Sequence, residues 1–86
     1  MLKTVLFLTD NVKPVARWLF PRAESYKQVG KSRAEGILKT GEPFLILQAM
    51  DPEHVREAVA GYEFGSYEVI GDVPLKSLEI AKTRVR

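Results

Sequence analysis

The chain has 86 residues, 45% of them hydrophobic and 28% charged, and a formal net charge of +2. This length predicts one small domain, residues 1–86, with a single core and no room for a large interior active site. The absence of cysteine excludes disulfides, a thiol nucleophile and cysteine-ligated metal sites, and it favours the cytoplasm as the compartment.

The charges are divided into blocks along the chain. Residues 13–39 carry seven basic and two acidic side chains, a local balance of +5. Residues 41–74 carry seven acidic side chains and one basic, a balance of −6, and the segment from residue 75 onward is basic again. This separation predicts a dipolar molecule that can steer a charged partner.

The first two elements have clear signals. Residues 3–9 form an apolar run rich in β-branched and aromatic side chains, which predicts a buried strand. No signal-peptide cleavage pattern follows it, and nothing approaches the ~18 apolar residues of a membrane span. Residues 12–19 repeat apolar side chains at helical spacing, which predicts a short amphipathic helix between Asn11 and Pro21.

The next segment permits two interpretations. Residues 22–31 are polar and basic without a period, which predicts a loop or a weakly marked strand. Ser32 and Glu35 fit a capping box, which favours a short helix over residues 33–40. The alternative is a hairpin that pairs the stretches GILK and FLIL around a turn at residues 40–43.

The remaining elements follow in order. The stretch PFLILQA predicts a second buried strand, and the best-marked helix comes after it, with Asp51 as N-cap, Pro52 in the first turn and Gly61 beyond the end. The stretch SYEVIG predicts a third strand, entered through a turn or bulge at Gly65. The tail from Pro74 fits a helix better than a strand, with Leu75, Leu78, Ala81 and Val85 on its apolar face.

This order predicts an α/β fold, a three-stranded, mainly parallel sheet with flanking helices. The hairpin alternative gives the order β-α-β-β-α-β of an α+β ferredoxin-like fold with a C-terminal extension. Because residues 3–9 and 43–49 carry little charge or proline, whichever of them forms a sheet edge is expected to need a partner. The predicted single core contains Val5, Phe7, Leu19, Leu45, Leu47, Val55, Val59 and Val69.

The stretch SYKQVGKS resembles the end of a phosphate-binding loop. Such a loop needs a glycine where Ser25 stands, and it must follow a buried strand directly. Both conditions fail, so Gly30 and Lys31 are expected to lie in a solvated basic loop, and Lys31 is expected to contact no nucleotide.

Enzyme chemistry has two weak candidates. His54 is the only histidine, and Asp51 and Glu57 lie one turn away on the same predicted helix, a conceivable metal set. Asp10 follows the first strand, where α/β folds place ligand groups. Helix capping, a turn and surface packing explain these residues better, so we predict no catalytic site, no metal and no cofactor. An enzyme with Asp10 or His54 at a subunit interface is the least favoured alternative.

Trp18 lies off the apolar stripe of its predicted helix. Either the segment 22–31 folds back over the indole, or the indole is partly exposed at a binding patch. We predict a non-catalytic interaction module that binds an acidic protein partner or a second copy of itself. The alternative partner is nucleic acid, with basic side chains of residues 22–39 on phosphates and an aromatic ring on a base. The predicted binding residues are Arg17, Trp18, Arg22, Tyr26, Lys27, Lys31 and Arg33.

Overall fold

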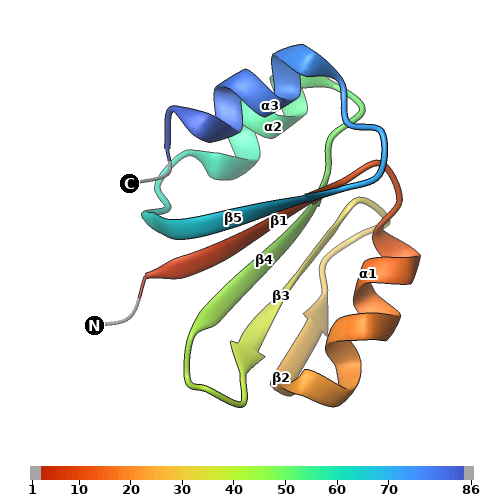
Figure 1. Cartoon of the computed structure of the whole chain (residues 1–86), viewed down its shortest axis with the longest axis vertical. Helices are drawn as coiled ribbons and strands as arrows, with labels where there is room; N and C mark the ends of the chain where they lie inside the picture. The colour runs from red at the N-terminus through yellow and green to blue at the C-terminus, as the bar shows by residue number, and fades with distance from the viewer. Residues whose placement is uncertain (1–2, 85–86) are drawn as a thin grey trace.

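Five strands and three α-helices follow one another in the order β-α-β-β-β-α-β-α (Figure 1). They belong to a computed structural model that describes residues 3–84. A single 3-10 turn, η1, follows the first helix. The elements are β1 (Thr4–Thr9), α1 (Val12–Leu19), η1 (Phe20–Arg22), β2 (Ala23–Gln28), β3 (Arg33–Leu38), β4 (Pro43–Gln48), α2 (Pro52–Val59), β5 (Phe64–Ile70) and α3 (Leu75–Lys82).

The strands form one mixed sheet in the order β2-β3-β4-β1-β5. β1 is parallel to both of its neighbours, β4 and β5, whereas β2, β3 and β4 form an antiparallel meander. The prediction of a small α/β domain is therefore confirmed. The prediction of three mainly parallel strands is wrong, because the sheet has two more strands and half of its four pairings are antiparallel. The ferredoxin-like alternative also lacks one strand, β2.

The predicted helix over residues 33–40 is wrong, and the hairpin alternative describes this segment correctly. β3 pairs with β4 in the antiparallel direction, with Gly36 opposite Phe44. A Cβ atom at Gly36 would collide with the backbone carbonyl of Ser25 and lie 2.8 Å from Cζ of Phe44, so glycine lets three strands approach closely here. Gly41, at φ 94°, makes the turn between β3 and β4.

Most of the segment 22–31 forms β2, the weakly marked strand, and its end leads into a hairpin turn. The tripeptide GKS lies in this turn between β2 and β3, where the Val29 N–H donates to the Arg33 carbonyl at 2.9 Å. Gly30 adopts φ 76° in the turn. A phosphate-binding loop connects a strand to a helix, whereas this turn connects two strands.

The two faces of the sheet carry two separate apolar clusters, one under α1 and one under α2 and α3. The prediction of a single core is wrong for this reason, although seven of its eight residues are buried. The exception is Val69, in the edge strand β5, which is 40% exposed. The cluster under α1 contains Val5, Phe7, Val12, Val15, Leu19, Ala34, Phe44 and Ile46. The cluster under α2 and α3 contains Leu6, Leu8, Leu45, Leu47, Ala49, Val55, Ala58, Val59, Phe64 and Ala81.

The helices begin where the sequence predicts. The side chain of Asn11 accepts a hydrogen bond from the Lys13 N–H at 3.3 Å, and that of Asp51 accepts from the Glu53 N–H at 3.0 Å. These caps satisfy amides that have no partner within the helix. Within residues 3–84, no helix is long and apolar enough to cross a membrane.

The C-terminal helix prediction is also confirmed, as α3. Its buried residues are Ser77 and Ala81, whereas Leu75, expected on the apolar face, is 69% exposed. Val85, the last residue expected on that face, lies outside the described residues.

The sheet edges differ from those predicted. The segments 3–9 and 43–49, which were expected to include an exposed edge, form β1 and β4 in the interior of the sheet, and β2 and β5 lie outermost. The bulge expected at Gly65 is present, since Thr4 pairs with Phe64 and Val5 with Ser66.

Candidate functional site

The seven residues predicted to form one binding patch do not lie together. Neighbouring residues of a strand point to opposite faces, and neighbouring residues of a helix differ by about 100° in direction, so a contiguous basic segment is divided by folding. Folding divides them into three groups. The first group, between α1 and β2, contains Arg17, Tyr26 and Lys31. Trp18 and Arg22 lie on the other side of α1, and Lys27 and Arg33 lie on the opposite face of the sheet.

A basic groove runs between α1 and β2. It consists of two adjoining hollows, of about 710 and about 480 Å³, that share Ala16 and Arg17 as a common wall. We define the basic groove by the six side chains that give it its chemistry: Lys13, Arg17, Phe20, Tyr26, Gln28 and Lys31.

The cations of the basic groove come from two elements. Lys13 and Arg17 lie one helical turn apart on α1, and Lys31 lies in the turn after β2. No acidic residue lines either hollow. The two ion pairs found among residues 3–84 are made by other side chains. The groove therefore presents three positive charges with no acidic side chain in its lining, which attracts anionic groups.

Two aromatic rings lie at one end of the basic groove. Phe20 is 66% exposed, and its ring centroid lies 5.7 Å from that of the half-buried Tyr26. The Tyr26 hydroxyl donates to Oε1 of Gln28 at 2.6 Å. Burial raises the pKa of Tyr26, so the ring is uncharged at neutral pH. This end of the groove offers flat apolar surface beside cations.

Trp18 faces the other side of α1, where it is 47% exposed. Its ring makes an edge contact with Phe7 at 6.4 Å between centroids, and the Arg22 guanidinium lies 4.2 Å from its ring centroid. Arg22 also donates from Nη1 to the Trp18 carbonyl at 2.7 Å. The indole thus has the partly exposed arrangement, with Arg22 stacked on it by a cation–π contact.

The indole borders a third hollow, of about 540 Å³, that reaches the edge strand β5. We call this the Trp18 hollow. Arg22, Lys39, Glu42 and Glu68 also line it, so both signs of charge are present. Besides Trp18 and these four charged residues, Val5, Phe7 and Ser66 line the Trp18 hollow.

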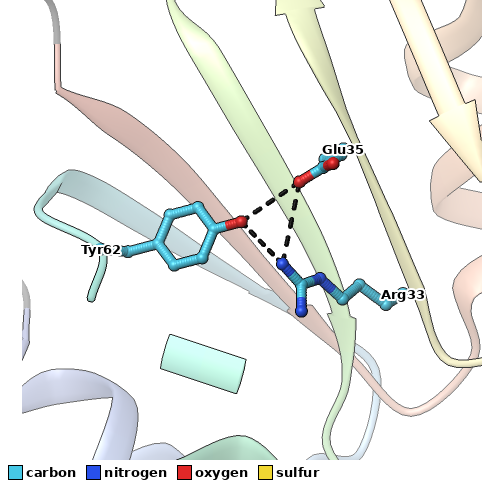
Figure 2. Close-up of polar contacts among 3 residues, drawn as sticks. All are labelled: Arg33, Glu35 and Tyr62. Atoms are coloured by element: carbon cyan, nitrogen blue, oxygen red, sulfur yellow. Dashed lines mark hydrogen bonds and ion pairs between the residues drawn. The ribbon is translucent and has the colours of Figure 1, made fainter. Parts of the chain in front are cut away.

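Arg33 is held in a polar network on the face opposite α1 (Figure 2). Its Nη2 donates to the Tyr62 hydroxyl at 2.7 Å, and this hydroxyl donates to Oε2 of Glu35 at 3.1 Å. The Arg33–Glu35 ion pair closes the triangle at 3.8 Å. Lys27 lies opposite Glu35 in the β2–β3 pairing, so both predicted cations are beside a carboxylate and away from the basic groove.

His54 bonds to Ser32, a contact that spacing in the sequence does not reveal. Its Nε2 lies 3.2 Å from the Ser32 Oγ, which ties the β2–β3 turn to the first turn of α2. No carboxylate hydrogen-bonds to the histidine ring within the described part of the chain, so a serine–histidine–acid triad is not formed there. Over the same residues, no group of three His, Asp or Glu side chains is placed to hold a metal ion.

Asp10 lies at the carboxyl end of β1 and stabilises a turn. Its Oδ2 accepts from the Asp72 N–H at 3.4 Å, and any Cβ atom at Gly71 would collide with the same carboxylate. Its backbone carbonyl accepts from Nε2 of Gln48 at 3.1 Å. These bonds connect the ends of three parallel strands and account for an acid at this position.

Two residues of the basic groove, Lys13 and Phe20, are not among the binding residues predicted from the sequence. A signal for Lys13 was present, because it lies four residues before Arg17 on a predicted amphipathic helix and therefore on the same face. Phe20 lies beyond the helix, in η1, where helical periodicity does not predict which way its side chain points.

No protein-family model, curated protein or solved structure matches the chain.

Proposed function

We propose that this protein is a non-catalytic interaction module that binds an acidic segment of a partner protein in the basic groove. One observation carries the proposal: Lys13, Arg17 and Lys31 surround a groove that no acidic side chain lines. Cations without counter-charges raise the local concentration of an anionic partner and speed its association. The absence of cysteine supports placing this activity in the cytoplasm.

The groove offers an acidic segment two kinds of contact. The Arg17 guanidinium is suited to a bidentate pair with a carboxylate, whereas Lys13 and Lys31 act as point charges. Phe20 and Tyr26 add apolar surface for a hydrophobic side chain of the same segment. A partner with carboxylates next to an apolar residue satisfies both requirements.

A second candidate partner is single-stranded nucleic acid, which the paired rings of Phe20 and Tyr26 favour. Stacking of a base on an aromatic side chain contributes about 1–3 kcal/mol, and the cations beside the rings are available to phosphates. In this arrangement Lys13 and Arg17 take the place of Lys27 and Arg33, the sequence-predicted phosphate ligands that lie on the other face of the sheet.

Fluorescence anisotropy with a labelled acidic peptide and a labelled oligouridine tests both partners. We expect the double substitution Lys13→Glu with Arg17→Glu to weaken peptide binding about tenfold or more, because two attractive contacts become repulsive. The matched control is Lys76→Glu with Lys82→Glu, which makes the same change of charge at exposed positions of α3.

Equal weakening by both double variants would show a general charge effect and overturn the groove assignment. The absence of saturable binding to either probe would overturn the interaction proposal itself. If the oligouridine binds more tightly than the peptide, and Phe20→Ala abolishes this binding, the partner is single-stranded nucleic acid and not an acidic protein segment.

A further inference from the structure

We propose that the protein also pairs with a second copy of itself along the outer edge of β5, and that this pairing buries the Trp18 hollow. The surface lies on the other side of α1 from the basic groove, so the inference goes beyond the proposed function and does not depend on it. The sequence predicts self-association through strands that the structure places in the sheet interior.

The two sheet edges differ in their protection against pairing. β2 contains Glu24 and Lys27, and its register with β3 is irregular near Ala23. β5 contains no proline and only one charged residue, Glu68. Among residues 3–84, no strand pairs with the outer edge of β5. Both edge strands contain a register irregularity, near Ala23 in β2 and at Gly65 in β5, so charge is what distinguishes them. Charged residues protect an edge strand, and β5 has one of them against two in β2, so β5 is the edge that accepts another strand.

The Trp18 hollow opens onto this same edge. Ser66 and Glu68 of β5 line it together with Val5 of β1 and with Trp18. α1 contacts β1, β3 and β4, so the sheet face near β5 extends beyond the helix (Figure 1). A strand added to β5 continues the floor of the hollow, and its side chains on this face lie against the exposed part of the indole.

The charges of the Trp18 hollow identify a second copy as its occupant. The hollow contains two cations, Arg22 and Lys39, and two acids, Glu42 and Glu68. In a two-fold interface each surface meets itself, so a surface with balanced charges is self-complementary. A polyanionic partner, in contrast, is repelled by both acids. Tryptophan and arginine are the residue types most enriched among residues that dominate interface energies.

Sedimentation equilibrium from low to high micromolar concentration tests the pairing directly. We expect a species of twice 9.7 kDa to form as the concentration rises. Trp18 is the only tryptophan, so its emission should shift to shorter wavelength over the same concentration range as the indole loses contact with water.

Two matched pairs of variants locate the interface. Trp18→Ala is compared with Phe20→Ala, which removes an exposed aromatic ring on the other side of α1. Ser66→Asp on β5 is compared with Ser25→Asp on β2, since both serines are exposed in edge strands. The first member of each pair should raise the dimer dissociation constant roughly tenfold or more, and the second should leave it unchanged.

A single species of 9.7 kDa at every concentration would overturn the proposal. A dimer weakened equally by Ser66→Asp and Ser25→Asp would place the interface elsewhere and overturn it as well. Far-UV circular dichroism reports whether each variant is folded. If Trp18→Ala does not fold, the wild-type concentration series and the serine pair still decide the outcome.

Discussion

β1 and β3 are both interior strands of six residues, yet different side chains hold them in the sheet. In β1 five residues are buried, because α1 covers one face and α2 and α3 cover the other. In β3 only Ala34 is buried, under α1. The opposite face of β3 carries the Arg33–Glu35 pair and Ile37, which is 43% exposed. Coverage by helices, and not position in the sheet, therefore decides how much a strand is buried.

The largest effect should come from the covered strand. Leu8→Ala in β1 removes a fully buried side chain, and we expect it to lower the free energy of unfolding by about 2–5 kcal/mol. Ile37→Ala in β3 is the control and should cost less than about 1 kcal/mol, because that side chain stays partly in water. Urea denaturation measures both variants. Equal losses would contradict the role of helix coverage.

The second prediction concerns how closely β3 approaches its neighbours. Gly36→Ala should lower the free energy of unfolding by about 3 kcal/mol, because the added methyl group meets the Ser25 carbonyl and the Phe44 ring. Gly61→Ala is the control. Its added methyl group has open space, and only the positive φ of 84° opposes alanine, so we expect a loss of about 1 kcal/mol. If Gly61→Ala proved the more harmful, the close strand packing at Gly36 would be refuted.

The third prediction addresses the polar network on the uncovered face of β3. Tyr62→Phe removes the hydroxyl that joins Arg33 to Glu35, and we expect it to reduce stability by about 1–2 kcal/mol. The loss is limited because the Arg33–Glu35 pair can close directly. Tyr67→Phe serves as the control in thermal unfolding, since its hydroxyl has no hydrogen-bond partner among the described residues. An unchanged melting temperature in both variants would show that the network does not stabilise β3.

The smallest effect concerns Tyr26, which lies opposite Gly36 in the β2–β3 pairing. Burial raises its pKa, so the folded chain holds the phenolic proton more tightly than the unfolded chain does. The contribution of the Tyr26 phenol to the free energy of unfolding is fully present below the unfolded-state pKa of about 10. This contribution is lost as the pH rises from there through the higher folded-state pKa. Tyr26→Phe should remove this part of the alkaline loss. The midpoints of urea denaturation, measured over a series of pH values, test this prediction. Midpoints that are the same for wild type and variant above pH 10 would contradict the raised pKa of Tyr26.

The sequence predicts the covered elements well and the partly covered ones poorly. β1 and β4 are buried on both faces, so each appears as a continuous apolar run. α1 and α2 have capping residues, Asn11 and Asp51, that mark where each helix begins. β2 and β3 carry polar side chains on a face that no helix covers, and Gly36 is disfavoured in a strand unless its neighbours lie close. The need for glycine at this position becomes visible only when β2, β3 and β4 are packed side by side.

The candidate site is predictable only in part, for the same physical reason. The basic segment is visible in the sequence, but its side chains are assigned to faces by the alternation of β2 and by the turn of α1. Tyr26 and Lys27 are adjacent in β2 and therefore point to opposite faces. Arg17 and Trp18 are adjacent in α1 and border different hollows. Because residues 22–31 show no periodicity in the sequence, the sequence does not define which way their side chains point.

The place of β1 between β4 and β5 also governs the order in which the sheet forms. Val5 pairs with Phe44, and Leu6 pairs with Tyr67, so β1 depends on partners that follow much later in the chain. The β2–β3–β4 meander needs only short turns and small losses of chain entropy. We therefore expect the meander to form before β1 pairs with β4 and β5. Until then the apolar β1 strand is unpaired and open to aggregation.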